Sequence, residues 1–345
     1  MKLAITGHFL TEKELKENFP GGRYLPVALI EFIINFLPRK FKLISNFDIL
    51  GKAQGCTVIV LLTSKQIMNS PKEKIRKIIL DTILYCQDEL KCDLVMLGAL
   101  TAPTTSAGLW LREQPEVKIA LTTGNTYTAA VAIQAAEKAI ELAGLDMANI
   151  KLAVVGAAGV IGEAVVKHFN EKAETNLILV ERSLDRFERL KPELKGSNYE
   201  LTADIKNLIK ADVIVTATSH PEALIGGDLL KKNAIVVDVS EPSDVVFNIE
   251  EIRPDVICID GGRVKWDRVG LGVRFGPPEH VGFACMTEGM LQALEQDGKD
   301  YIGSVNMEHL KETIQWAEKW GFELADFTCF NNPIDPQRFK KIKNK

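Results

Sequence analysis

The sequence predicts an α/β fold built mostly of parallel sheet, followed by helices near the C-terminal end. Short runs rich in Val, Ile and Leu alternate along the chain with helical patterns, as expected for parallel strands buried on both faces. One of these runs leads through a glycine-rich turn directly into an amphipathic helix. The length of 345 residues suits two compact domains.

The composition is that of an ordinary globular protein, with 46% hydrophobic and 26% charged residues. A formal net charge of −4 gives no reason to expect nucleic acid as a partner. The six cysteines form no CxxC pair and have no histidine at zinc-ligand spacing, so we expect no metal site and a reducing compartment. The apolar run Leu25–Leu37 is shorter than the roughly 20 residues that a membrane crossing takes. We therefore expect a cytoplasmic protein without a transmembrane segment.

The first domain is expected to span residues 1–122 and to have an α/β fold. The expected strands are Leu3–Thr6, Thr57–Leu62 and Leu94–Leu97, and the expected helices are Pro26–Phe36 and Lys72–Glu89. The apolar run Val27–Leu37 has two interpretations. It either lines an elongated apolar channel or is an ordinary buried helix.

A second domain is expected over residues 123–275, and a C-terminal helical segment over residues 276–345. An alanine-rich helix covers about Thr126–Ala143 and stops at Gly144. The expected strands that follow it are Leu152–Val155, Leu177–Val180, Val213–Thr216, Ile235–Val237 and Val256–Ile259. The C-terminal segment is helical at 286–296 and 307–321, and its basic tail after Asn331 is expected to fray.

Three glycines follow the expected strand Leu152–Val155 with the spacing G-x-x-G-x-x-G, in a unit that begins at Lys151. Gly156 permits a tight turn, Gly159 permits close approach of a pyrophosphate, and Gly162 permits close helix packing. Because the turn lies between a buried strand and a helix, it predicts a Rossmann dinucleotide-binding domain. The expected contacts in this turn are Gly156, Ala157, Ala158, Gly159, Val160, Ile161 and Gly162.

The residues after the second strand of this domain bear on the choice between NAD and NADP. Glu181 stands where a carboxylate binds the ribose hydroxyls of NAD, whereas Arg182 and Ser183 stand where an arginine and a hydroxyl hold the 2′-phosphate of NADP. We expect NADP, with NAD as the alternative. Small residues at the end of a later strand are expected to pass under the nicotinamide ribose; they are Thr216, Ala217 and Thr218.

Two further segments carry side chains suited to a substrate site. Thr122–Ala130 reads TTGNTYTAA and begins the alanine-rich helix, where Thr123 or Asn125 either caps the helix or lines a cleft. Cys285 stands in the expected first turn of another helix, where backbone N–H groups favour a thiolate. His280 either assists this cysteine or only shapes the turn before it. The other five cysteines have no activating feature.

Together these segments resemble the long-chain acyl-[acyl-carrier-protein] reductases of cyanobacteria. The resemblance runs through almost the whole chain and is carried by ITGHF, LGALT (Leu97–Thr101), TTGNTYTA, the glycine turn, IDGG (Ile259–Gly262), FACMTEGML and the closing WGFEL. It implies that Cys285 is the nucleophile that attacks an acyl thioester of acyl carrier protein or coenzyme A. The acyl-enzyme then takes hydride from NADPH and is released as an aldehyde, without a metal.

The chain also resembles shikimate dehydrogenases, through the Asn-Thr pair after TTG and through GMLQ at Gly289–Gln292. This second resemblance implies a dehydrogenase of a small polar hydroxy or amino acid, with Asn125, Thr126 and Gln292 as substrate contacts. The Asp that the shikimate pattern has after Asn-Thr is replaced here by Tyr127. A third hypothesis is a cofactor-binding regulator without catalytic activity.

Overall fold

The computed structural model describes residues 1–9, 12–172, 175–195, 198–220, 222–267, 269–271, 277 and 280–343. The chain divides into two compact units, and each is described by itself. Unit 1 comprises Met1–Gly124, Trp266–Phe275 and Cys285–Ser304, and unit 2 comprises Asn125–Lys265, Gly276–Ala284 and Val305–Lys345. The first division thus falls two residues beyond the expected boundary. The expected C-terminal segment 276–345 is not a separate part, because its residues are shared between the two units.

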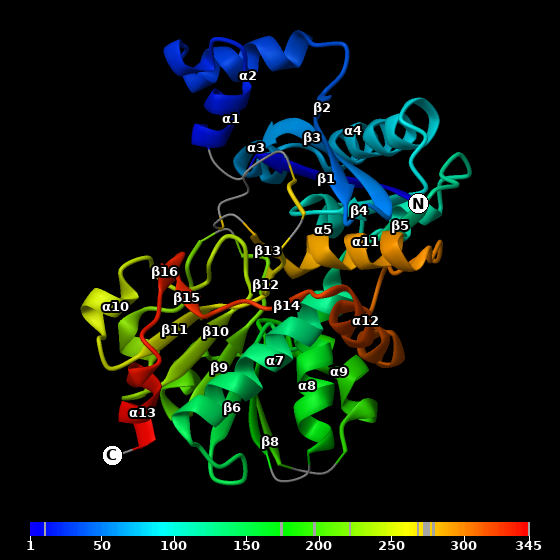
Figure 1. Ribbon diagram of the computed structural model, residues 1–345. Helices are drawn as coiled ribbons and strands as arrows, with labels where there is room; N and C mark the ends of the chain where they lie inside the picture. The colour runs from blue at the N-terminus through cyan, green and yellow to red at the C-terminus, as the bar shows by residue number, and fades with distance from the viewer. Residues whose placement is uncertain are drawn as a thin grey trace. The chain divides into compact units, whose positions relative to one another are not determined.

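Unit 1 is built on a five-stranded sheet in the order β2-β3-β1-β4-β5 (Figure 1). Strands β1, β3, β4 and β5 are parallel, and β2 adds an antiparallel edge that the sequence analysis did not predict. The strands are β1 (Lys2–Phe9), β2 (Phe41–Ile49), β3 (Ala53–Thr63), β4 (Leu94–Leu97) and β5 (Ala120–Thr122). The helices are α1 (Glu12–Asn18), α2 (Val27–Phe36), α3 (Ser64–Asn69), α4 (Lys72–Leu84), α5 (Thr101–Thr104), α6 (Leu109–Arg112) and α11 (Ala284–Glu295).

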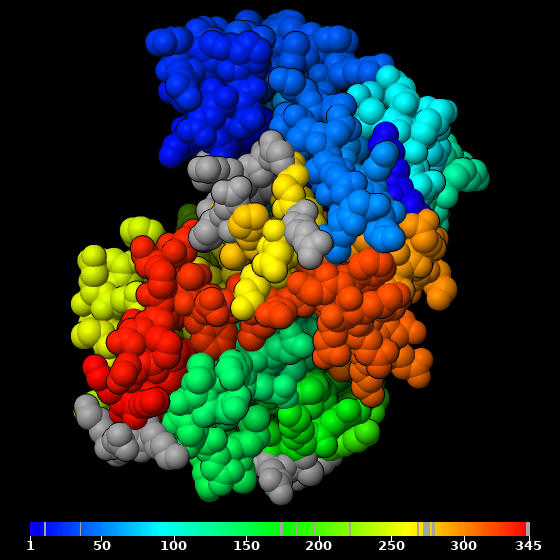
Figure 2. Space-filling model, in the orientation of Figure 1, coloured from blue at the N-terminus to red at the C-terminus, as the bar shows by residue number. Residues whose placement is uncertain are grey.

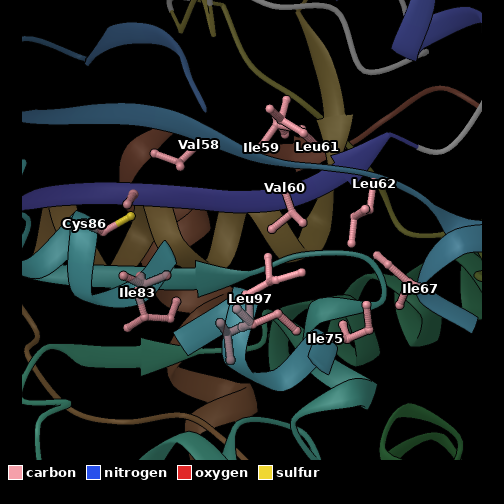
Figure 3. Close-up of a cluster of buried hydrophobic side chains, with 14 of the residues drawn as sticks. Val58, Ile59, Val60, Leu61, Leu62, Ile67, Ile75, Ile83, Cys86 and Leu97 are labelled. Atoms are coloured by element: carbon pink, nitrogen blue, oxygen red, sulfur yellow. The ribbon is translucent and has the colours of Figure 1, made fainter. Parts of the chain in front are cut away.

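The core of unit 1 lies between its sheet and its helices. Figure 3 shows Val60 of β3, Leu97 of β4 and Ile83 of α4 within this cluster of buried side chains. Helix α4 ends at Leu84, five residues before the expected end, and one turn of π-helix continues to Glu89. In α2, Ile30 and Ile34 are fully buried, so ordinary core packing accounts for that half of the helix.

The sequence predicts an N-terminal domain over residues 1–122, and unit 1 includes in addition Cys285 to Ser304, that is, α11 from its second residue and the segment after it. Gly289 lies so close to Leu3 and Met96 that an added Cβ would be 3.1 Å from each. Tyr301 donates its backbone N–H to the Leu121 carbonyl oxygen over 2.8 Å and bridges to Thr122 beside β5. The edge of the sheet at β5 is therefore paired by a segment far away in the sequence.

Unit 2 has a six-stranded parallel sheet in the order β11-β10-β9-β6-β7-β8. The chain begins in the middle at β6, runs outward to β8, and resumes at β9 on the other side. This is the doubly wound Rossmann order, with its switch point between β6 and β9. The strands are β6 (Lys151–Val155), β7 (Asn176–Val180), β8 (Tyr199–Thr202), β9 (Val213–Thr216), β10 (Ile235–Asp238) and β11 (Ile257–Asp260). The predicted fold class is confirmed.

The remaining elements of unit 2 pack around this sheet. They are α7 (Asn125–Ala143), α8 (Val160–Glu171), α9 (Phe187–Leu190), α10 (Ile249–Ile252), β12 (Arg263–Lys265), β13 (Val281–Phe283), α12 (Met307–Trp320), β14 (Glu323–Leu324), β15 (Thr328–Cys329), β16 (Asn332–Pro333) and α13 (Gln337–Lys343). Helix α7 contacts α8, α12 and α13 as well as β9 and β10. Its many alanines make this possible, because small side chains let neighbouring backbones approach closely.

The expected fraying of the basic tail is wrong for the residues that the structure describes. Helix α13 packs against α7, and Figure 2 shows its surface in red beside the green of α7. Phe339 is only 1% exposed, and its ring centroid lies 5.7 Å from that of Phe327. Arg338 forms an ion pair with Glu250 and donates to the Val256 carbonyl oxygen. Buried aromatic area and the paired arginine thus hold the helix in place.

None of the helices formed by the described residues combines the length and the apolar character that a membrane crossing requires.

Candidate functional site

The first candidate site, called here the cofactor edge, consists of residues 156–162, 181–183 and 216–218 in unit 2. They follow β6, β7 and β9, so they lie at the carboxyl ends of strands on both sides of the switch point. In open α/β sheets this is where ligands bind. The structure therefore brings all the predicted cofactor residues to one edge of one sheet.

Two glycines of the turn are required by the fold itself. Gly156 has φ +75°, and a Cβ there would stand 2.8 Å from the Ala217 carbonyl oxygen. A Cβ on Gly162 would stand 2.1 Å from the Gly156 carbonyl oxygen. Gly159 differs, because its nearest neighbours would be the carbonyl oxygens of Gly156 at 3.0 Å and Ala217 at 3.8 Å. Packing therefore explains the glycine at position 159 less well than the other two. Gly159 also directly precedes the first turn of the 12-residue helix α8. The turn therefore fits a bound pyrophosphate.

Gly159→Ala is expected to leave the protein folded and to weaken dinucleotide binding about tenfold or more, since the added methyl group occupies the space of the pyrophosphate. Gly162→Ala is expected to lower the stability by about 1–3 kcal/mol, because its methyl group collides with backbone. Thermal unfolding and fluorescence titration with NADPH and NADH separate the two effects. If Gly159→Ala binds NADPH and NADH with wild-type affinity, the glycine turn is not part of the cofactor site.

The residues after β7 are arranged with the carboxylate inside and one arginine outside. Glu181 is 7% exposed, and its Oε1 lies 3.8 Å from Nη1 of Arg186. Arg182 is exposed and Ser183 is half-buried. The buried carboxylate has a cation beside it within unit 2, while Arg182 is open to a ligand. A carboxylate and an arginine therefore both stand at the end of β7, where the adenine ribose binds in Rossmann folds.

The loop after β9 is held by hydrogen bonds to buried acidic residues that were not predicted from the sequence. Asp244 is fully buried and accepts hydrogen bonds from the hydroxyl groups of Thr216, Thr218 and Ser240. Asp238, the last residue of β10, accepts from the Ser243 hydroxyl over 2.6 Å. The available signal was the segment DVSEPSDV, which places three acids, Asp238, Glu241 and Asp244, at and just after the end of a buried strand. Parallel pairing puts that strand end at the cofactor edge.

Asp238 is also a source of pH-dependent stability. Burial, reinforced by the nearby Asp244 carboxylate, raises its pKa from 3.8 to about 7. A raised carboxyl pKa in the folded state means that stability is highest below the unfolded pKa and falls as the pH rises through about 7. We expect the free energy of unfolding to decrease between pH 4 and 7 relative to Asp238→Asn, on the order of 2–4 kcal/mol. Urea unfolding of both proteins at several pH values tests this. The same dependence of the free energy of unfolding on pH in both would contradict it.

The second candidate site, called here the cysteine cluster, consists of Thr122, Gly124, Cys285 and Glu288 in unit 1. Cys285 is the second residue of α11 and is half-buried. Gly124, with φ +70°, lies against its backbone: an added Cβ would stand 2.3 Å from Cα and 2.5 Å from Cβ of Cys285. Thr122 donates its hydroxyl to Oε1 of Glu288 over 2.5 Å. TTGNTYTA and FACMTEGML, two segments of the sequence resemblance, therefore meet here.

The other five cysteines, in which the sequence shows no activating feature, are buried. Burial raises the pKa of the Cys86 thiol far above its usual range. The sulfur atoms of Cys56 and Cys92 lie 3.7 Å apart within the core of unit 1. None of the six cysteines forms a disulfide. In the part of the chain that the structure describes, no group of three or more His, Cys, Asp or Glu residues is arranged to hold a metal ion.

Two more segments of the resemblance, ITGHF and LGALT, meet at the carboxyl ends of β1 and β4. His8 is 5% exposed; its Nδ1 lies 2.9 Å from the Phe9 carbonyl oxygen, and its Nε2 accepts the Leu100 N–H over 3.1 Å. Burial lowers its pKa. A neutral ring with Nδ1–H satisfies both contacts, so His8 fixes the loop after β4 rather than acting as a base.

The residues predicted to contact a small substrate belong to both units. Asn125 and Thr126 begin α7 in unit 2, where Asn125 is half-buried and Thr126 is 5% exposed. Gln292 is fully buried in unit 1, and its Nε2 donates to the Lys299 carbonyl oxygen over 2.9 Å. Its amide N–H thus holds the chain after α11, while its Oε1 is buried without a hydrogen-bond partner among the described residues. His280 is exposed, with φ +67°.

Comparisons with known proteins find relatives of parts of the chain and a structure that aligns with its whole length. The family model for shikimate / quinate 5-dehydrogenase matches residues 135–260, which lie wholly in unit 2. A long-chain acyl-[acyl-carrier-protein] reductase of Synechococcus elongatus is 32% identical over 183 residues, covering 50% of this chain and 52% of the relative. A glutamyl-tRNA reductase of Acaryochloris marina is 31% identical over 137 residues, covering 36% of this chain and 31% of the relative. The L-tryptophan dehydrogenase structure from Nostoc punctiforme aligns with a TM-score of 0.42 and 12% identity, covering 100% of this chain and 87% of that one.

The chain thus spans about half, or less, of the length of these curated relatives. The likeness to the acyl-[acyl-carrier-protein] reductase covers half of the chain rather than nearly all of it. The glutamyl-tRNA reductases, which the sequence analysis did not name, are similarly close. The chain is a distant homologue of NAD(P)-dependent reductases and dehydrogenases.

Proposed function

We propose that this protein reduces an acyl thioester, carried by acyl carrier protein or coenzyme A, to an aldehyde, with Cys285 as the nucleophile and NADPH as the hydride donor. The observation that carries the proposal is the contact between Gly124 and Cys285 in the cysteine cluster. It sets the partly exposed cysteine at the start of a 12-residue helix, against the loop that ends β5. The two relatives named above support it, because both are named as reductases of an acyl group held on a larger carrier.

The chemistry asked of Cys285 is acyl transfer. Its sulfur attacks the thioester carbonyl carbon, the bond from that carbon to the carrier sulfur breaks, and the carrier thiol leaves with the proton that Cys285 gave up. The backbone N–H groups in the first turn of α11 would stabilise the oxygen that becomes negative in this step. The covalent acyl-cysteine then holds the carbonyl in one place for reduction. Addition of a hydride to the carbonyl carbon and of a proton from water to its oxygen gives a hemithioacetal, which releases the aldehyde and restores the thiol.

The cofactor edge would hold the nicotinamide dinucleotide. Gly159 and the start of α8 would receive the pyrophosphate, Arg182 and Ser183 the adenine ribose with its phosphate, and Thr216–Thr218 the nicotinamide ribose. The bound cofactor supplies a hydride. The protein supplies the fixed backbone groups that orient it.

Arg182→Ala is expected to weaken NADPH binding by about 1–3 kcal/mol and to leave NADH binding nearly unchanged, because it removes a charge-assisted contact to the 2′-phosphate. Isothermal titration of both cofactors measures this. Arg186→Ala is the matched control for the second arginine of this loop, whose guanidinium lies beside Glu181. Equal losses of affinity for both cofactors, or a preference of the wild-type protein for NADH, would instead support NAD as the cofactor and Glu181 as its ribose ligand.

The rival function is that of a shikimate-dehydrogenase-like enzyme acting on a small polar hydroxy or amino acid. The family match favours it, but that match covers residues 135–260, which carry the cofactor edge and not the cysteine cluster. Mass spectrometry after incubation with acyl thioesters, without cofactor, separates the two functions. One acyl group on Cys285 supports thioester reduction. No adduct with any thioester, together with oxidation of a hydroxy acid, supports the rival.

A further inference from the structure

We propose that Asp244 is a positioning residue that fixes the loop after β9 for the nicotinamide half of the bound dinucleotide. This inference rests on the proposed cofactor edge, and it assigns a role to a buried side chain that the sequence analysis did not single out. Asp244 lies six residues after the end of β10 and is fully buried in unit 2.

Both carboxylate oxygens of Asp244 accept hydrogen bonds. Its Oδ1 accepts the Thr218 hydroxyl over 2.6 Å. Its Oδ2 accepts the hydroxyls of Thr216 and of Ser240, the latter over 2.6 Å, and the Thr218 N–H over 3.4 Å. All of these partners are donors, and an ionised carboxylate is the side chain that only accepts. Four donors converging on one buried carboxylate specify one arrangement of the loop.

The main chain of Asp244 holds the other end of the same loop. Its carbonyl oxygen accepts the N–H groups of Leu224 and Ile225 over 2.7 and 2.8 Å. Val245 bridges to Ile225 directly beside this contact. The loop that begins at Thr216 is therefore fastened at both ends to one residue.

The fastened loop presents its backbone to the glycine turn. Ala217 lies between Thr216 and Thr218, and its carbonyl oxygen would be 2.8 Å from a Cβ on Gly156. The Ser240 hydroxyl accepts the Thr218 N–H over 2.9 Å, which adds a second tie behind the loop. The position of Ala217 is thus fixed on one side by the hydrogen bonds of its two neighbours to Asp244. On the other side it is limited by the glycine turn.

The position of the loop in the sheet determines which half of the cofactor it serves. A Rossmann sheet consists of two mononucleotide-binding halves, and the dinucleotide lies across the switch point between them. Here β6, β7 and β8 form the half that carries the adenine-side residues Glu181–Ser183, and β9, β10 and β11 form the other half. Loss of Asp244 should therefore affect the nicotinamide end and spare the adenine end.

The test compares Asp244→Asn with Asp260→Asn by isothermal titration of the intact protein. Asp260 is a matched control, because it also ends a strand of this sheet and accepts one hydroxyl and two N–H groups, from Thr328, Phe330 and Asn331. The probes are NADPH, NADH and the adenine-side fragment adenosine 2′,5′-bisphosphate. We expect Asp244→Asn to raise the Kd of the tighter-binding dinucleotide about tenfold while the fragment Kd changes less than about twofold. Asp260→Asn should change neither.

Unchanged dinucleotide affinity in Asp244→Asn would overturn the inference, as would an equal loss for dinucleotide and fragment, which indicates general damage to the unit. If Asp244→Asn does not fold, Ser240→Ala removes the second tie and should lower dinucleotide affinity alone, about threefold. Equal affinity in Ser240→Ala would then overturn the inference. A wild-type protein that binds neither dinucleotide would instead refute the cofactor edge itself, and the acyl adduct on Cys285 still tests the rest of the proposed function separately.

Discussion

Cys285→Ala is expected to abolish both the acyl adduct and aldehyde formation. Wild-type protein incubated with an acyl thioester and no cofactor should gain the mass of one acyl group, and peptide mapping should place it on Cys285. The variant should gain none, because the other five cysteines are buried. Addition of NADPH to the acylated wild type should discharge the adduct as aldehyde. A fall in activity of at least about 10³-fold is expected when a covalent nucleophile is removed.

Two further variants show whether the loss is specific. Cys285→Ser should also be nearly inactive, since a serine hydroxyl stays protonated without a dedicated base. Cys86→Ala removes a fully buried thiol of unit 1 and should keep the adduct. NADPH affinity should remain at the wild-type value in all three proteins, because the glycine turn is unchanged. Substantial activity in Cys285→Ala, or an adduct on another cysteine, would refute the nucleophile.

The local parts of this fold follow from patterns that act over a few residues. The strand over Leu94–Leu97 and the glycine turn were predicted at their observed positions, because a buried strand and a tight turn each leave a short apolar or glycine signature. The helix predicted over Thr126–Ala143 begins one residue earlier, at Asn125. In such segments local propensity and tertiary structure agree.

What the sequence did not reveal depends on contacts between distant segments. Strand β2 mixes exposed, half-buried and, near its end, buried residues, and only its antiparallel pairing with β3 makes it a strand of the sheet. The return of Tyr301 to β5 joins residues 180 positions apart, which no local pattern encodes. In the sequence, Asp244 looks like any other acidic loop residue. Only the pairing of β9 with β10 brings it next to the loop that it holds. Its role becomes visible only when the donors around it are known.

Gly124→Ala is expected to disable the cysteine cluster without changing a single reactive group. The added methyl carbon would stand 2.3 Å from both Cα and the carbonyl oxygen of Cys285, which are backbone atoms of a helix and cannot turn aside. The first turn of α11 must therefore shift. We expect a loss of stability of about 2–4 kcal/mol, from the overpacking and from the φ of +70° that alanine disfavours. The rate of Cys285 acylation should fall at least about tenfold, since small displacements of a nucleophile are costly.

Gly51→Ala separates the two causes, because Gly51 has φ +68° and an added Cβ there meets nothing within 4 Å. This control should lose only the conformational part, about 1 kcal/mol, and should acylate at the wild-type rate. Thermal unfolding gives the stability of both variants, and the rate at which the acyl mass appears gives their reactivity. If Gly124→Ala acylates as fast as Gly51→Ala, the contact between Gly124 and Cys285 is only packing. If Gly124→Ala alone is slow while both variants are folded at the assay temperature, the loop that ends β5 sets the position of the nucleophile.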